Sequence, residues 1–377
     1  MTRPLVVVSL EPWDDVWRRN QYLIDGLLRR DDDRSVLFVE PPSDPLHDVR
    51  SRRRPRPATG FRDAAGHGGR LRLLEPVKAL PRAAGPLADR LLHGQVRRAV
   101  ARLGWREPIL WLNDPRWWRL AERTGWDAVY DITDDWTRAE RAPREHARLV
   151  EGDAELLSRS RRVVVCSPGL AESKAGAHPV LIPNAVDVER YRRPLPRPDD
   201  LPADPVAVYV GTLHEDRLDV PLLTRIGPRV AEAGGAIALV GPDALSRAHS
   251  EALRATPGIR LLGPRPWAAI PAYLQHAHAL AVPHVVSPFT DSLDPIKAYE
   301  YLAVGRPIVS TPVAGFRERA GTPGTVIADA AGFGDALVRT LGAPSARSSP
   351  AVPDWSERVA DYDALLRGIG SPAAPPA

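Results

Sequence analysis

Two charged residues, Lys297 and Glu300, lie three positions apart in this 377-residue chain and have side chains that can bind different parts of one polar substrate. Asp294 and Pro295 precede them. This pair predicts a helix that starts at Pro295, because Asp accepts the free N–H groups of a first turn and Pro fits the first helical position. Lys297 would then lie in the first turn, where the helix dipole favours a phosphate. Glu300 follows about one turn, or ~5 Å, further along, placed to accept hydrogen bonds from a ribose diol. The spacing indicates a nucleoside diphosphate site; an amphipathic helix with two solvated charges is the alternative.

Apolar, β-branched runs alternate with helix-length segments along the whole chain. A glycine, Gly305, is expected to end the helix after Lys297, and a buried strand follows it. The expected strands are residues 5–10, 36–39, 71–74, 109–112, 128–132 and 163–166, then 206–210, 236–240, 259–262, 279–282 and 308–310. Helices are expected after the first strand and at 87–103, 145–157 and 355–366. This alternation predicts an α/β protein with two doubly wound domains.

The division into domains follows from a proline-rich segment near the middle of the chain. Residues 191–205 predict a linker between a first domain, residues 1–190, and a second, residues 206–353. Residues 354–377 predict a last helix that can return to the first domain, and then a flexible tail.

The run from Asp294 to Thr311 resembles the donor-binding motif of bacterial glycosyltransferases with the GT-B fold, those of the glycosyltransferase 4-like group. The matching residues are Pro295, Lys297, Tyr299, Glu300, Tyr301, Leu302, Ala303, Gly305 and Pro307. Ser292 stands where the commoner form of the group has a second glutamate, eight residues before Glu300. The resemblance implies two Rossmann-like domains that face a central cleft.

Three further segments resemble the same group. Pro183 to Asp187 resembles the segment that closes the first domain, with Ala185 in place of a glycine. Gly211 opens a loop whose cations pair with the donor diphosphate in the group; here Thr212 replaces an arginine and Arg217 takes the place of a lysine. Gly263 to Pro266 matches the loop around the nucleotide base. The resemblance implies a donor site made of Gly211, Arg217, Gly263, Arg265, Asp294, Pro295, Ile296, Lys297 and Glu300, with His214 and His284 nearby.

The first domain must supply the acceptor site and a general base. Asp131 lies near the end of the strand at 128–132, and Asp134 and Asp135 follow it, at a sheet edge where catalytic groups concentrate. Asp134 is the first candidate for a base and Asp135 the second; helix capping and solvation are the alternatives. Asn113, at the end of the preceding strand, is a further candidate for the cleft.

Composition excludes several other classes. The content of 44% hydrophobic and 26% charged residues is typical of a soluble globular protein. One cysteine, Cys166, excludes an intramolecular disulfide and a cysteine metal cluster, and no metal-ligand spacing is present, so no metal or cofactor is expected. No G-x-G-x-x-G follows the first strand, which argues against nicotinamide binding. No leader or long apolar run is seen, and we expect a cytoplasmic protein.

The net charge of +4 comes from the first half of the chain, where Arg50, Arg52, Arg53, Arg54 and Arg56 are clustered. This segment could contact anionic lipid headgroups at the inner face of a membrane; a solvated loop is the alternative. No nucleic-acid motif accompanies the charge.

The resemblance implies a retaining, metal-independent enzyme of the hexosyltransferase type. It would move a sugar from a nucleotide diphosphate sugar, its substrate, to a hydroxyl of a sugar, lipid-linked or small-molecule acceptor, in cell-surface polysaccharide or glycolipid assembly. Tailoring of a secondary metabolite, a nucleotide-sugar epimerase of the same fold, and a non-catalytic nucleotide-binding protein are the alternatives.

Overall fold

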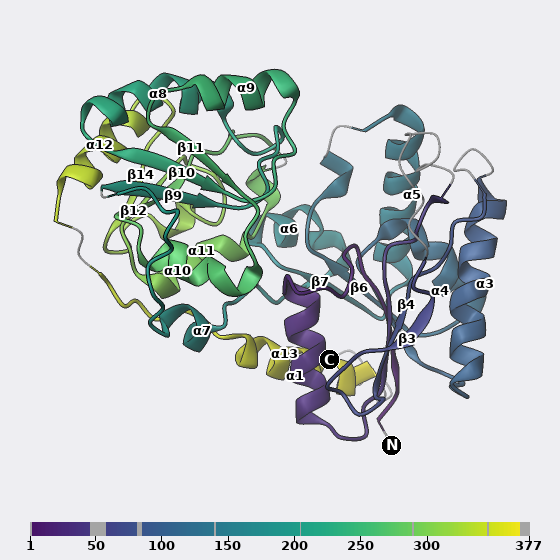
Figure 1. Ribbon diagram of the computed structural model, residues 1–377. Coiled ribbons are helices and arrows are strands. Elements are labelled where there is room, and N and C mark those ends of the chain that lie inside the picture. The colour runs from purple at the N-terminus through teal and green to yellow at the C-terminus, as the bar shows by residue number, and fades with distance from the viewer. Residues whose placement is uncertain are drawn as a thin grey trace. The chain divides into compact units, whose positions relative to one another are not determined.

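The computed structural model describes residues 2–45, 58–80, 85–138, 141–203, 205–288, 290–344 and 347–369. The chain forms two compact units (Figure 1). Unit 1 is Met1–Pro183 together with Ser356–Ala377, and unit 2 is Asn184–Trp355.

Unit 1 is built on a sheet with the strand order β3-β4-β2-β1-β5-β6-β7-β8 among its described residues. The strands are β1 (Leu5–Val8), β2 (Val36–Val39), β3 (Phe61–Asp63), β4 (Leu71–Leu74), β5 (Ile109–Leu112), β6 (Ala128–Ile132), β7 (Arg162–Val165) and β8 (Val180–Leu181). Only the β3·β4 pairing is antiparallel among these strands. The order reverses between β1 and β5, so a ligand of this unit is expected beyond the carboxyl ends of these two strands.

Helices cover both faces of the unit 1 sheet. They are α1 (Arg19–Arg30), α3 (Pro86–Arg102), α4 (Trp118–Thr124), α5 (Pro143–Arg159), α6 (Pro168–Ser173) and α13 (Trp355–Ile369). Alternate strand residues such as Val6 and Leu110 pack into one core with α3, α4, α5 and α6. On the opposite face, Trp111 stacks on Tyr362 of α13, with ring centroids 4.5 Å apart. Helices α1 and α13 lie side by side there, so close that a Cβ at Gly26 would clash with Val359 (Figure 1).

Unit 2 contains a parallel sheet with the order β11-β10-β9-β12-β13-β14 among its described residues. The strands are β9 (Val206–Val210), β10 (Ala236–Val240), β11 (Ile259–Gly263), β12 (Ala279–Val282), β13 (Ile308–Ser310) and β14 (Thr325–Ile327). The order reverses between β9 and β12. Their carboxyl ends lead to Gly211 and His284, and a nucleotide is expected at such a point.

Two apolar cores enclose the unit 2 sheet. The helices are α7 (Val188–Arg192), α8 (Val220–Glu232), α9 (Arg247–Ala255), α10 (Ile270–Gln275), α11 (Ile296–Val304) and α12 (Phe333–Gly342). Helices α7, α10 and α11 contribute to one core, and α8, α9 and α12 to the other. None of the helices in the described part of the chain combines the length and the apolar character needed to cross a membrane.

The unit boundary differs from the domain limits expected at residues 190 and 206. Residues 184–190 belong to unit 2. The proline-rich segment is packed, because Tyr191 and Leu201 are buried in the same core as β9 and α11. Helix α13 lies in unit 1 apart from Trp355. The arginine cluster at residues 50–56 and the tail at 371–377 lie outside the described residues.

Candidate functional site

Helix α11 begins at Ile296, one residue later than predicted. Pro295 is its N-cap, with φ −71° and ψ 121°, and the Pro295 side chain makes no capping hydrogen bond. The Asp294 carboxylate instead accepts hydrogen bonds from the Tyr299 hydroxyl, 2.8 Å from Oδ1, and from the backbone N–H of Asn184, 2.7 Å from Oδ2. The predicted capping role of Asp294 is therefore wrong, because Pro295 and not Asp294 is the N-cap residue of α11. Pro295 has no polar side chain that could accept from the first N–H groups of α11, and a helix start with such a cap suits a bound anion.

Lys297 lies at the carboxyl end of β9. Its Nζ donates a hydrogen bond to the Tyr209 hydroxyl at 3.0 Å and lies 4.1 Å from the centroid of the Tyr209 ring. A Cβ on Gly211 would come within 2.9 Å of the same nitrogen. Gly211 has φ +145°, which L side chains rarely adopt. The backbone of this loop is thus shaped to leave room for the ammonium group.

His284 follows β12, the strand next to β9 in the sheet. Its Nε2 is 3.2 Å from the Tyr209 hydroxyl, and its side chain is buried. Burial, and after it the positive charges of Lys297 and Arg217, hold the pKa of His284 well below its ordinary value. The imidazole is therefore neutral at physiological pH.

The backbone of Arg217 lies at the same edge of the sheet. Its carbonyl accepts a hydrogen bond from Val285 N–H at 2.8 Å, and Leu218 pairs with His284 in an isolated bridge. His214 is exposed, and its Nδ1 lies 3.4 Å from Asp216 in its own loop. The structure therefore gathers Gly211, Arg217, His284 and Lys297 at the switch point of unit 2, while His214 faces solvent.

Glu300 lies one turn after Lys297, as predicted. The hydroxyl of Tyr191 donates a hydrogen bond to its Oε1 at 2.5 Å. Burial raises the pKa of the Glu300 carboxyl, and the Tyr191 hydrogen bond and the positive charges of Lys297 and Arg190 oppose that rise. The contact with Tyr191 fixes one carboxylate oxygen of Glu300.

The loop after β11 lies beside the loops after β9 and β10. The carbonyl of Gly263 accepts a hydrogen bond from Gly241 N–H at 2.9 Å, and a Cβ on Gly241 would lie 2.1 Å from the carbonyl oxygen of Gly211. The Arg265 side chain turns away to form an ion pair with Asp200, and its Nε donates to the Tyr273 hydroxyl at 2.9 Å. Of the predicted residues of this loop, Gly263 therefore contacts the neighbouring loops by a backbone hydrogen bond. The Arg265 side chain is held by Asp200, in the segment before β9.

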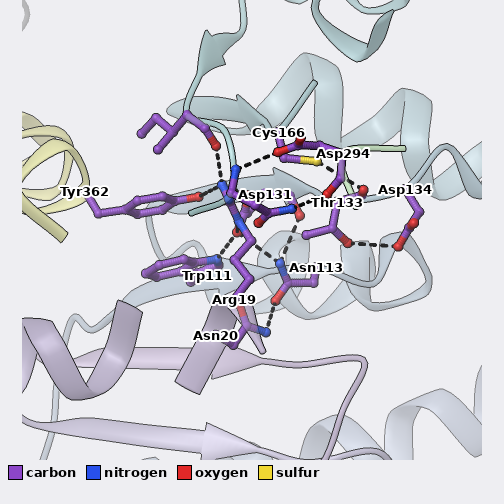
Figure 2. Close-up of polar contacts among 12 residues, drawn as sticks. Arg19, Asn20, Trp111, Asn113, Asp131, Thr133, Asp134, Cys166, Asp294 and Tyr362 are labelled. Carbon is purple, nitrogen blue, oxygen red and sulfur yellow. Dashed lines mark hydrogen bonds and ion pairs between the residues drawn. The ribbon is translucent and has the colours of Figure 1, made fainter. Parts of the chain in front are cut away.

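In unit 1 the three predicted aspartates have different surroundings, and Figure 2 shows two of them. Asp131 is fully buried. It forms an ion pair with Arg19 at 3.3 Å and accepts hydrogen bonds from Trp111 Nε1 at 3.1 Å and Asn113 Nδ2 at 3.2 Å. The guanidinium of Arg19 also donates to the Tyr362 hydroxyl, which ties α13 to α1. With these donors around it, Asp131 holds the interior of unit 1 together and is poorly placed to take a proton from a substrate.

Asp135 is also buried. It accepts a hydrogen bond from the Thr137 hydroxyl at 2.5 Å, and it lies 3.2 Å from Arg138 Nε and 3.7 Å from Lys174 Nζ. Asp134 is the most exposed of the three, and the Thr133 hydroxyl donates to its Oδ2 at 3.3 Å. Of the predicted acids, Asp134 has the carboxylate most open to an incoming hydroxyl.

Asn113 lies at the switch point of unit 1, buried at the end of β5. Its Nδ2 donates to the Asp131 carbonyl at 3.0 Å, and its Oδ1 accepts from Asn20 Nδ2 at 2.9 Å (Figure 2). Asn20 also donates to Ser9 Oγ, at the end of β1. This chain of amides joins the two central strands of the sheet, so Asn113 has a structural role.

Sequence reasoning missed the residues that support the predicted ones. Tyr209 holds Lys297 in place and Tyr191 holds Glu300. For Tyr209 the sequence offered a signal, because its side chain has a polar tip within the aliphatic strand before Gly211. Within the described part of the chain, no group of three or more His, Cys, Asp or Glu residues could hold a metal ion.

Comparisons with known protein families and sequences match parts of the chain. Residues 204–343 match the family model described as Glycosyl transferases group 1. TuaH from Bacillus subtilis (strain 168), assigned to teichuronic acid biosynthesis as a glycosyltransferase, is 26% identical over 230 residues, which cover 54% of this chain and 55% of TuaH. The chain thus matches about half the length of this relative.

Solved structures match over nearly the full chain. Sucrose-phosphate synthase (tll1590) from Thermosynechococcus elongatus has a TM-score of 0.65 at 18% identity, with 98% of this chain and 97% of that chain covered. Anabaena Alr3699/HepE, in complex with UDP and glucose, has a TM-score of 0.61 at 13% identity, with 97% and 100% covered. These likenesses confirm the predicted fold class of two Rossmann-like domains. The chain therefore has the GT-B fold, and its residues 204–343 match the model of the Glycosyl transferases group 1 family.

Proposed function

We propose that this protein transfers a sugar from a nucleotide diphosphate sugar to a hydroxyl group of an acceptor. The observation that carries the proposal is the convergence of Lys297, Arg217 and the start of α11 at the switch point of unit 2. Glu300 lies one turn further along, where a ribose attached to the diphosphate would be expected. Alr3699/HepE, which was solved with UDP and glucose, has the same fold.

In the proposed reaction the bond between the anomeric carbon and the diphosphate oxygen breaks, and a bond to the acceptor oxygen forms. The electron pair leaves with the diphosphate, so negative charge develops on its oxygens. Lys297, Arg217 and the first N–H groups of α11 stabilise this charge without a metal ion, since fixed donors act most strongly where charge develops. The group resemblance favours retention of configuration, which NMR of the product anomer would test.

The acceptor is proposed to bind unit 1, with Asp134 taking the proton of its hydroxyl. The similarity to TuaH favours a cell-surface polysaccharide as the product, with a sugar or a lipid-linked sugar as acceptor. No nucleic acid is expected as a partner. A cytoplasmic location, peripheral membrane contact and independence of metals and cofactors stay predictions.

Isothermal titration with UDP, GDP, ADP and TDP tests the donor site. We expect the best-binding nucleotide to bind at least tenfold more weakly to Lys297→Ala than to the wild type, because a charge-assisted hydrogen bond is lost. Arg247→Ala is the matched control, since it removes an exposed cation from α9 of the same unit. Equal binding by wild type and Lys297→Ala removes Lys297 from the site, and no binding of any of the four nucleotides by the wild type overturns the proposed function.

A further inference from the structure

Three polar side chains form a chain of hydrogen bonds under the proposed diphosphate site. Lys297 Nζ lies 3.0 Å from the Tyr209 hydroxyl, and that hydroxyl lies 3.2 Å from His284 Nε2. Tyr209 is 1% exposed and His284 is 4% exposed. A buried network of this kind costs free energy unless each donor finds an acceptor, so the direction of each bond can be derived.

The lysine sets the direction. An ammonium group has donors and no acceptor, so Lys297 donates to the Tyr209 oxygen. The Tyr209 hydrogen then needs an acceptor of its own, which neutral His284 provides at an unprotonated Nε2. The His284 proton is consequently on Nδ1. If His284 were protonated, Nε2 would donate as well, the Tyr209 hydrogen would have no acceptor there, and a third positive charge would be added beside Lys297 and Arg217.

His284 is held firmly enough to fix this arrangement. Its backbone N–H donates to Thr311 Oγ1 at 3.1 Å, and the Thr311 hydroxyl lies 2.8 Å from its carbonyl oxygen. Leu218 pairs with it from the loop that carries Arg217. The segments after β12 and β13 therefore hold the backbone of His284, and from there its ring meets the Tyr209 ring with centroids 5.7 Å apart.

We propose that Tyr209 is a positioning residue that holds the Lys297 ammonium group against Gly211 for the diphosphate of the donor, and that His284 keeps the Tyr209 hydroxyl turned to accept from it. This inference rests on the proposed function and names two supporting residues of the same site. Lysine has a flexible four-carbon side chain, and its positioning otherwise costs conformational entropy on binding. The Tyr209 ring attracts the ammonium group, but only the hydroxyl gives that attraction a direction.

The test measures how much the diphosphate adds to nucleoside affinity. For the nucleotide that binds best among UDP, GDP, ADP and TDP, titration gives the dissociation constants of the nucleoside and of the nucleoside diphosphate, and their ratio is the diphosphate increment. We expect Tyr209→Phe to lower this increment about tenfold and to leave the affinity for the nucleoside unchanged. Tyr130→Phe is the control, because it removes another buried strand hydroxyl, one that donates to Asp153 beside Lys174.

A pair of variants at position 284 tests the second part. His284→Leu should lower the increment as Tyr209→Phe does, and His284→Gln should restore most of it, because the Gln carbonyl oxygen can replace Nε2 as acceptor. This pair decides the question if Tyr209→Phe fails to fold. The inference is overturned if Tyr209→Phe has the same diphosphate increment as the wild type, or if both His284 variants lose the increment equally. In either case a loss of nucleotide affinity in Lys297→Ala still supports the proposed function. A wild type that binds none of the four nucleotides overturns both.

Discussion

The hydroxyl of Tyr191 lies 2.5 Å from Oε1 of Glu300. The two residues lie on different helices and are 109 positions apart in the chain. Tyr191 is buried on α7, beneath α11. The contact fixes the rotation of the Glu300 carboxylate, so a ribose diol would meet the group in one orientation. This contact also favours the charged form of a carboxyl whose pKa burial raises.

Tyr191→Phe is expected to reduce the preference of the protein for ribose over 2′-deoxyribose. The variant keeps the ring and loses the hydrogen bond, so the Glu300 carboxylate can rotate and its pKa rises further. We expect the affinity for the best-binding nucleoside diphosphate to fall about tenfold and that for its 2′-deoxy analogue to fall less. Titration of both ligands against wild type and Tyr130→Phe gives the comparison, and an unchanged ratio would exclude Tyr191 from ribose recognition.

Gly211→Ala and Gly241→Ala should have different effects although both glycines have φ near +145°. The Cβ added by Gly211→Ala would meet the flexible end of Lys297, so the lysine can move and nucleotide binding is the property most affected. At position 241 the new Cβ would meet the Gly211 carbonyl oxygen, which is backbone and cannot move alone. We expect Gly241→Ala to lower the free energy of unfolding by about 3 kcal/mol or more. Urea unfolding and nucleotide titration of both variants check this, and equal unfolding midpoints would contradict it.

Central strands could be predicted from sequence because parallel strands buried on both faces are continuous apolar runs. The limits of β2, β5, β6, β9, β10, β12 and β13 match the expected ones. Three short strands at or near the sheet edges, β3, β8 and β14, were missed because each has three residues or fewer and none is fully buried. A short run that is half exposed does not differ in pattern from a loop.

The site could be predicted only where one local segment contains it. Lys297 and Glu300 lie on one helix, and their spacing places them. Asp294 was misread as a helix cap because its competing donor, Asn184, is 110 residues away in sequence. The proline-rich segment suggested a linker, yet the side chains of Tyr191 and Leu201 pack in the core of unit 2. Long-range contacts of this kind leave no local pattern.

His93 should make unit 1 less stable as the pH falls below 6.5. It is buried on α3, and Arg123 Nη1 lies 3.1 Å from its Nδ1. Burial, and after it the charges of Arg123 and Arg119, lower the pKa of His93 from 6.5 to about 4. Between these two pH values the unfolded chain takes up a proton that the folded protein does not, so the stability present above pH 6.5 is lost progressively down to about pH 4.

The His93→Gln variant isolates this effect. Relative to the variant, the wild type should lose about 2 kcal/mol more of its free energy of unfolding between pH 7.5 and pH 4.5, since one pKa unit corresponds to about 1.4 kcal/mol. Urea unfolding at the two pH values measures the difference. If wild type and variant lose the same amount, His93 is not a buried neutral group.

Asp131→Asn and Asp134→Asn should separate a structural aspartate from a catalytic one. Asp131 is fully buried against Arg19, and removal of one partner of a buried ion pair costs about 3–5 kcal/mol. Asp134 is partly exposed, so Asp134→Asn should change the free energy of unfolding by less than about 1 kcal/mol.

If Asp134 takes the proton of the acceptor hydroxyl, its variant should lower kcat about 100-fold or more, with little change in nucleotide affinity. We would measure kcat as the rate at which nucleoside diphosphate is released from the nucleotide sugar, with the acceptor that gives the highest wild-type rate. In a retaining reaction the acceptor approaches the face that the diphosphate leaves, so an oxygen of the departing diphosphate can take the proton instead; an Asp134→Asn variant with the wild-type kcat would assign the proton to that oxygen.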